Sequence, residues 1–176
     1  MKKRKAIAIG VSILVVGVLV FLFHSIAIES GRQRTIAQKL ETIPDFVFYQ
    51  LCGTPYTQNC LNRQQAAVLI YFTSDCDFCI HKIRNIAQHL YGFSGTQLLF
   101  ISPESIEAIE AFAKSKGLLH QPDVLFFQDR RHVFLTRFEV SSSPHTLVYD
   151  KNGNLLRRFA GQVLATTIIR VLQEND

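Results

Sequence analysis

Two cysteines, Cys76 and Cys79, stand with two residues between them in the segment "YFTSDCDFCIHKI". A pair with this spacing can supply half of a zinc site, close an inert disulfide, or act as a reactive dithiol. A zinc site usually needs a second close pair, but the other cysteines, Cys52 and Cys60, are more widely spaced in a turn-rich stretch. The elements around the pair must therefore decide between the three interpretations.

The pair lies where a buried strand is expected to turn into a helix. The run "AAVLIYF", 66–72, is continuously apolar and rich in β-forming residues, as is typical of a strand buried on both faces. After the pair, apolar residues recur at helical spacing at Ile83, Ile86, Ala87 and Leu90. The polar residues expected on the outer face of this helix are Lys82, Arg84 and Gln88.

This placement favours a reactive dithiol. The free amide groups and the dipole of a first helical turn stabilise an anion, so Cys76 is expected to act as the attacking thiolate. Cys79, one turn further on, is near enough to close a disulfide with Cys76 and so to resolve a mixed disulfide with a substrate. We therefore favour thiol–disulfide exchange over a zinc site and over a purely structural bridge.

The following elements alternate between strands and helices. The segment "QLLFI" predicts a second buried strand, and "VLFF", 124–127, predicts a third. Between them, Ser102 is expected to cap a helix that has Pro103 at its first position and Glu104 in its first turn.

The C-terminal part of the chain predicts a hairpin and a closing helix. Asn152–Gly153 suits a type I′ turn between two strands, and an amphipathic helix is expected from Val163 to Leu172. The whole order of elements predicts an α/β sandwich with a central mixed sheet. The cysteine pair then falls at the sheet edge where open α/β sheets place their active sites.

The formal net charge of +5 is concentrated at the N-terminus. Lys2, Lys3, Arg4 and Lys5 contribute four positive charges, and subtracting these four leaves the rest of the chain at +1. A nearly neutral body without an aromatic-rich basic stripe argues against nucleic acid as a partner.

An apolar run, Ala6–Phe23, follows the basic cluster directly and carries no charge. A helix of this length rises roughly 27 Å, close to the hydrocarbon thickness of a bilayer, so we expect an uncleaved single-pass anchor. The alternative is export after cleavage of a signal peptide near Ser25–Ala27, although the apolar core of a signal peptide is usually shorter. The positive-inside rule places everything after Glu29 on the outer, periplasmic side of a bacterial cytoplasmic membrane.

Three parts are therefore expected: residues 1–28 as basic tail and transmembrane anchor, 29–43 as a polar tether, and 44–176 as the α/β domain. On the oxidising outer side, Cys52 and Cys60 favour a structural disulfide over a second redox pair.

The segments "AAVLIYFTSDCDFCIHKI", "ISPES", "SSSPHTLVYDKNG" and "FAGQV" resemble those of the membrane-anchored, thioredoxin-like thiol–disulfide oxidoreductases of the TlpA/ResA type, over roughly residues 44–172. The resemblance implies that Cys76 and Cys79 are the redox pair. It also implies that Pro144 is cis and lies against the disulfide, with the backbone of Ser143 offered to a substrate, and that Glu104 lies near the cysteines and moves protons. No cofactor and no metal are implied.

The chain departs from the family pattern at three positions. Asp75 stands where tryptophan is common before the first cysteine, and the protein has no tryptophan. Ile70 replaces the buried acid of the preceding strand, and His145 follows Pro144 where threonine is common. These differences leave the fold and the pair intact but weaken any transfer of substrate.

The expected partners are protein thiols and disulfides in the cell envelope, with apocytochromes as one candidate that the family suggests, and an upstream electron donor in the membrane. Asp75 and Asp77 flank Cys76 and disfavour an added negative charge, which predicts a reductant.

Two other functions stay open. A thiol peroxidase is suggested by Thr73, three residues before Cys76, although Leu69 stands where that motif has proline. A non-enzymatic Cu(I) carrier would use Cys76, Cys79 and His145, because soft thiolates suit Cu(I).

Overall fold

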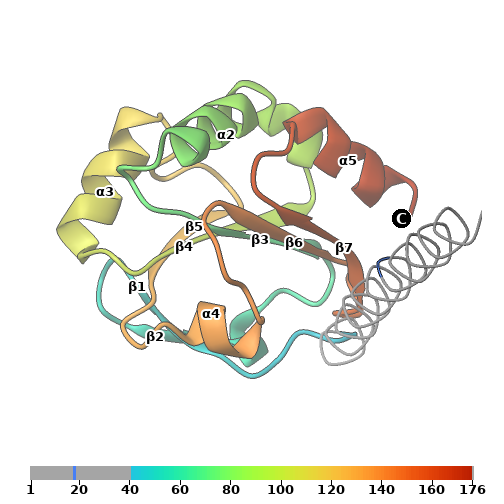
Figure 1. The fold of residues 1–176 in the computed structure, drawn as a ribbon, viewed down its shortest axis with the longest axis horizontal. Helices are drawn as coiled ribbons and strands as arrows, with labels where there is room; N and C mark the ends of the chain where they lie inside the picture. The colour runs from blue at the N-terminus through green and yellow to red at the C-terminus, as the bar shows by residue number, and fades with distance from the viewer. Residues whose placement is uncertain (1–17, 19–40, 176) are drawn as a thin grey trace, which may run out of the picture. The chain divides into compact units, whose positions relative to one another are not determined.

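The computed structural model of the chain describes Val18 and residues 41–175 (Figure 1). All of these except Val18 belong to a unit that spans residues 40–176. The expected anchor at 6–23 lies outside the described residues apart from Val18, as does the tether up to residue 40. Within the described part, no helix combines the length and the apolar character that a membrane crossing requires.

Seven strands form one sheet in the order β2-β1-β5-β4-β3-β6-β7. They are β1 (Val47–Gln50), β2 (Pro55–Thr57), β3 (Ala66–Tyr71), β4 (Thr96–Ser102), β5 (Val124–Gln128), β6 (His145–Tyr149) and β7 (Leu155–Ala160). Strands β3, β4 and β5 are parallel to one another, whereas β6 pairs antiparallel with β3 and β1 pairs antiparallel with β5. The predicted mixed sheet is therefore confirmed.

Helices cover both faces of the sheet, as Figure 1 shows, with α2, α3 and α5 on one face and α4 on the other. The helices are α2 (Asp77–Gln88), α3 (Ile106–Ser115), α4 (Val133–Arg137) and α5 (Ala165–Gln173), with short 3-10 turns η1 (Gln58–Cys60) and η2 (Leu90–Phe93). Every residue of the central strand β4 is buried, because both of its faces are covered.

Aromatic rings fill the core on the face of α4. Phe134 stacks on Tyr71 and on Phe138, with ring centroids 5.1 Å and 4.7 Å apart. Phe48 lies behind them, 6.3 Å from Phe134. Phenylalanine supplies large buried area without a polar atom that needs a partner, so stacked phenylalanines build this core in a chain that has no tryptophan.

Helix α3 begins later than the sequence predicted. Its N-cap is Ser105, whose hydroxyl accepts a hydrogen bond from the Ala108 amide at 3.3 Å. The proposed cap, Ser102, is instead the last residue of β4 and pairs in register with Gln128 of β5. Sheet pairing with β5 therefore prevails over the local capping signal, and Glu104 precedes the helix instead of lying in its first turn.

The hairpin between β6 and β7 also differs from the prediction. Asp150 N–H donates to the Asn154 carbonyl, so three residues lie in the loop. Gly153 has φ of +82°, but Asn152 does not have the positive φ that a type I′ turn requires. The Asp150 carboxylate accepts hydrogen bonds from the amides of Asn152 and Asn154, each at 2.8 Å, and this side-chain capping stabilises the longer loop.

Candidate active site

The cysteine pair lies at the junction of β3 and α2, as predicted. Cys76 is the N-cap of α2, and its sulfur accepts a hydrogen bond from the Cys79 amide at 3.4 Å. Cys76 is half-buried, whereas Phe78, between the two cysteines, is 62% exposed. The first sulfur therefore sits at the amide-rich mouth of the helix, within reach of solvent.

Cys79 is fully buried, and its sulfur lies 3.1 Å from the Ser143 hydroxyl. Burial raises the pKa of the Cys79 thiol to about 11, which the contact with Ser143 partly opposes. At neutral pH this sulfur is therefore a protonated thiol. Both cysteines are unpaired, so the structure shows the dithiol form of the pair.

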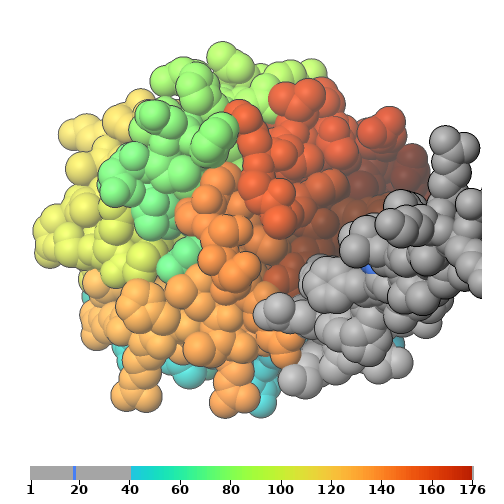
Figure 2. All heavy atoms as spheres, in the orientation of Figure 1, coloured from blue at the N-terminus to red at the C-terminus, as the bar shows by residue number. Residues whose placement is uncertain are grey.

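The segment before β6 packs against the second cysteine. The Ser143–Pro144 peptide bond is cis, as the resemblance implied, and Pro144 is buried. The Pro144 carbonyl accepts a hydrogen bond from the Gly161 amide at 2.9 Å, which ties this segment to the end of β7. In Figure 2, the green atoms of α2, the orange atoms of the 130–150 region and the red atoms of α5 meet on one face of the molecule.

Glu104 binds the loop that carries Cys76. Its carboxylate accepts hydrogen bonds from the Ser74 amide at 2.9 Å, from the Ser74 hydroxyl at 2.6 Å and from the Ser102 hydroxyl at 2.9 Å. Among the described residues, no hydrogen bond joins this carboxylate to either sulfur. The contacts of Glu104 are with the loop before Cys76 and with the end of β4, and its part in moving protons stays a prediction.

Lys82 is not on the outer face of α2, contrary to the prediction from helical spacing. The residue is 1% exposed, and its Nζ donates a hydrogen bond to the Gly161 carbonyl at 3.0 Å. Burial lowers the pKa of Lys82 to about 8, against the opposing effect of Cys79. The missed signal was its spacing, since a residue three positions after a buried helical residue shares its face.

His145 is buried and neutral. Its Nε2 accepts a hydrogen bond from Nε of Arg158 at 2.9 Å, and Arg158 also donates to the carbonyl of Glu139. Burial, with Arg158 and then Lys82 adding to it, lowers the pKa of His145 to about 4. This contact occupies Nε2 and leaves Nδ1 buried without a partner. The described residues contain no group of three potential metal ligands, so the copper site considered from the sequence is not assembled.

The disulfide favoured for Cys52 and Cys60 is not formed. Both thiols are free and exposed, and they lie beyond opposite ends of β2. The Cys52 sulfur donates to the Thr54 hydroxyl at 3.2 Å, whereas the Cys60 sulfur contacts the Thr57 hydroxyl at 3.7 Å. A strand between two sulfurs keeps them from the short separation that a disulfide needs.

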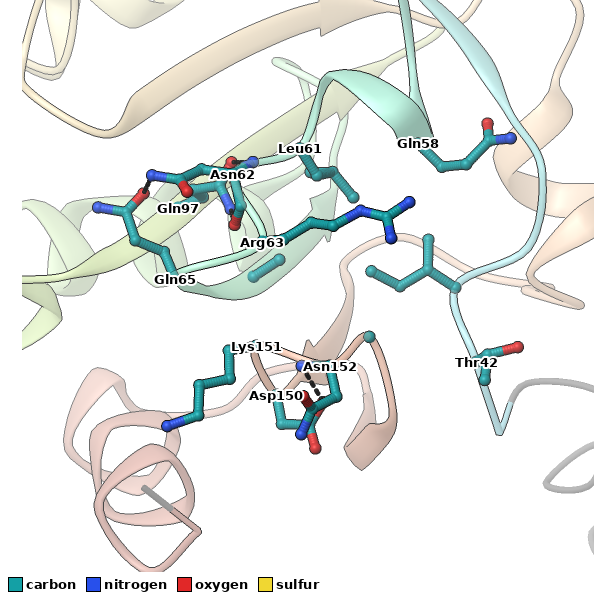
Figure 3. A pocket seen from close by; sticks show the side chains of 13 residues that line it. Thr42, Gln58, Leu61, Asn62, Arg63, Gln65, Gln97, Asp150, Lys151 and Asn152 are labelled. Atoms are coloured by element: carbon teal, nitrogen blue, oxygen red, sulfur yellow. Dashed lines mark hydrogen bonds between the residues drawn. The ribbon is translucent and has the colours of Figure 1, made fainter.

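A cavity of about 360 Å³ lies away from the cysteines (Figure 3). It is lined at the start of β3 and β4 and by the β6–β7 loop, including Gln65, Gln97 and Asp150. Gln97 is buried there and exchanges two hydrogen bonds of 2.9 Å with the backbone of Asn62. None of the residues that line it belongs to the cysteine site, which lies at the opposite ends of these parallel strands.

The fold and the pair at its strand–helix junction define the class, a thioredoxin-like oxidoreductase. Residues 40–158 match the model of the AhpC/TSA family, so the chain belongs to this family.

Known proteins agree with that assignment. The chain is 26% identical over 176 residues to the thiol-disulfide oxidoreductase ResA of Geobacillus kaustophilus, with 98% of each chain covered. The resemblance to the TlpA/ResA type is thereby confirmed.

Two solved structures share the fold. The thio-disulfide isomerase of Thermus thermophilus is 24% identical, with a TM-score of 0.63 over 76% of this chain and 94% of that one. The peroxidoxin BcpB of Mycobacterium tuberculosis is 16% identical, with a TM-score of 0.66 over 77% of this chain and 96% of that one.

Proposed function

We propose that this protein exchanges a Cys76–Cys79 dithiol or disulfide with protein substrates in the bacterial cell envelope. The observation that carries the proposal is the unequal setting of the two sulfurs. Cys76 caps α2 within reach of solvent, whereas Cys79 is sealed behind it against Ser143. Cys76 can therefore react with a substrate, while Cys79 stays buried in the same helical turn until the mixed disulfide has formed.

The reaction has two steps. The Cys76 thiolate attacks one sulfur of a substrate disulfide, which forms a mixed disulfide and releases the other substrate sulfur as a thiolate. Cys79 then loses its proton and attacks the sulfur of Cys76, so the second substrate sulfur leaves and an intramolecular disulfide remains. The substrate gains two electrons and the cysteine pair loses two.

The proposed direction is reduction of the substrate. Asp75 and Asp77 are both exposed, so water and salt screen most of their effect on Cys76. The buried thiol of Cys79 gives stronger support, because its raised pKa means that the reduced pair gains little stabilisation as a thiolate at this sulfur. A less stabilised reduced form corresponds to a more reducing couple.

The proposed site comprises Cys76, Cys79, Pro144 and Glu104. Pro144 and the preceding Ser143 shape the surface beside the pair, and exposed Phe78 provides an apolar contact for a visiting polypeptide. For Glu104 we propose support of the loop around Ser74, with proton transfer as the alternative.

We further propose a single-pass anchor at residues 6–23 that holds the domain on the periplasmic side, with signal-peptide cleavage as the alternative. The basic cluster before an uncharged apolar run supports this orientation. The pair would then draw electrons from a membrane donor and pass them to disulfides of envelope proteins, with apocytochromes as one candidate.

Trapping tests the proposal. The full chain with Cys79→Ser is expressed in a bacterium, and proteins joined to it are separated under non-reducing conditions. We expect mixed disulfides with envelope proteins that dithiothreitol releases, and none with Cys76→Ser. Both variants also carry Cys52→Ser and Cys60→Ser, because these exposed thiols could form disulfides of their own. If Cys76 reacts with an alkylating agent but traps no protein, the proposal is wrong.

A thiol peroxidase is the second candidate, because the AhpC/TSA family match and the fold of BcpB both agree with it. Peroxide consumption by the reduced full chain distinguishes the two functions. A peroxidase must consume hydrogen peroxide orders of magnitude faster than free cysteine does.

A further inference from the structure

Lys82 is a buried cation without an acidic partner. It is the only lysine buried among the described residues, and it forms no ion pair with a carboxylate there. Its one hydrogen bond in that part of the chain goes to the Gly161 carbonyl. Burying an ammonium group is unfavourable unless an opposite charge offsets the loss of its hydration. The ionisable group that favours its charged form is Cys79.

Contacts from three segments enclose Lys82 and Cys79 together. The two residues are one turn apart on the buried face of α2, a spacing that brings Cβ atoms to about 5–6 Å. Cys79 contacts the Ser143 hydroxyl, and the Pro144 carbonyl accepts from the Gly161 amide. The Gly161 carbonyl in turn accepts from Lys82. The side chain of Lys82 is thus enclosed, away from solvent, by the same segments that cover the second sulfur.

We propose that Lys82 is the electrostatic partner of Cys79, and that the positive charge on its Nζ stabilises the thiolate that resolves the mixed disulfide. This inference rests on the proposed exchange function. Lys82 acts through Cys79 and not on the substrate, so it is a positioning residue. Thiol–disulfide exchange needs a thiolate, and the buried Cys79 has no other described cation on its own helical face.

The resolving step moves one proton and exchanges one disulfide bond for another. Lys82 is protonated at neutral pH because its pKa is about 8, so solvent takes the proton of the Cys79 thiol and leaves a thiolate beside the Lys82 ammonium. The thiolate attacks the sulfur of Cys76, forming the Cys76–Cys79 bond and breaking the bond between Cys76 and the substrate. The substrate sulfur leaves with the bonding electron pair and takes a proton from water. Lys82 keeps its proton throughout, and the proton that solvent took from Cys79 balances the proton that the substrate sulfur takes up.

The titration of Lys82 and Cys79, and not of the other ionisable groups around them, controls the resolving rate. The groups that interact electrostatically with Lys82 are Cys79 of α2 and His145 of β6, and Arg158 of β7 donates a hydrogen bond to His145. His145 stays neutral above pH 4, where its pKa lies, and Arg158 keeps its charge but is held by His145 and Glu139. The reactive state, a Cys79 thiolate beside a Lys82 ammonium, forms when the pair loses one proton. The resolving rate should therefore rise with pH up to about 8, where Lys82 titrates, and then level off.

Stopped-flow reaction with dithionitrobenzoate separates the two steps. The full chain is used in detergent micelles with Cys52→Ser and Cys60→Ser, so that only the pair reacts. Attack by Cys76 releases one equivalent of thionitrobenzoate, and resolution by Cys79 releases a second. For Lys82→Met, we expect a first phase within about threefold of the parent and a second phase slowed by about tenfold or more at neutral pH. The levelling above pH 8 should also disappear in this variant.

Lys82→Arg should restore part of the second phase because it keeps the charge. Lys114→Met removes an exposed lysine of α3 and should change neither phase. An unchanged second phase in Lys82→Met, or equal slowing of both phases, would overturn the inference. A resolving rate of the parent protein that keeps rising above pH 8 would also overturn the inference. This test needs no substitution at Lys82. A parent without a second phase would instead refute the exchange function itself.

Discussion

Replacing Glu104 distinguishes support of the redox loop from proton transfer. Glu104→Ala removes three hydrogen bonds, two from Ser74 and one from Ser102. At about 1 kcal/mol each, the loss is about 3 kcal/mol of unfolding free energy. For a chain of this size, such a loss lowers the melting temperature by roughly 6–12 °C. Because the loop around Ser74 leads directly into Cys76, we also expect its attack on dithionitrobenzoate to slow about tenfold, equivalent to about 1.4 kcal/mol.

Glu104→Gln provides the matched comparison. Its amide oxygen can accept from the Ser74 amide, and its amide nitrogen can donate to the hydroxyl of Ser74 or Ser102. Most of the support is therefore kept, with a loss of about 1 kcal/mol, but a neutral amide cannot relay a proton. We expect both phases of thionitrobenzoate release to stay within about threefold of the parent.

Thermal unfolding of the full chain in detergent and stopped-flow release are measured on the same preparations. Glu110→Gln, at an exposed position of α3, controls for the loss of one negative charge. If Glu104→Gln keeps its melting temperature but reacts as slowly as Glu104→Ala, support of the loop is not the explanation. Proton transfer by Glu104 would then be the better account.

The stability of the protein should depend on pH through Lys82 and His145. A native pKa of about 8 for Lys82 against the ordinary 10.5 penalises the native state by about 3 kcal/mol below pH 8, and the penalty disappears as pH rises to 10.5. Urea unfolding of Lys82→Met should therefore show about 2 kcal/mol more stability than the parent at neutral pH, after about 1 kcal/mol is lost with the Gly161 hydrogen bond; lower stability would contradict this. For His145, a native pKa of about 4 against 6.5 means that the parent loses about 3 kcal/mol as pH falls from 6.5 to 4. His145→Gln should remove most of this loss. If the variant loses as much unfolding free energy as the parent when the pH falls from 6.5 to 4, His145 is not the cause.

The parts of the fold that follow from local pattern were predictable. The apolar run before the cysteines and the helical repeat after them located β3, α2 and the pair between them. The cis bond before Pro144 came from the family resemblance and not from the physics of the sequence.

The errors arose where a distant segment decides the local outcome. Lys82 looked like an exposed polar residue because its acceptor, Gly161, lies 79 residues further along the chain. Ser102 looked like a helix cap because its pairing with Gln128 in β5 is a property of the sheet. In the hairpin, the Asp150 side chain selected a longer loop than Asn152–Gly153 alone would form.

The burial of Cys79 depends on residues that come late in the sequence. Ser143 and Gly161, which close over the helix, follow the cysteines by more than sixty residues, and β6 and β7 must join the sheet before either is in place. Until then an incompletely folded chain exposes both thiols alike to oxidants and to foreign cysteines. The two sulfurs therefore become unequally reactive toward an alkylating agent only when the C-terminal hairpin docks. A newly made chain is most easily misoxidised before the hairpin has docked.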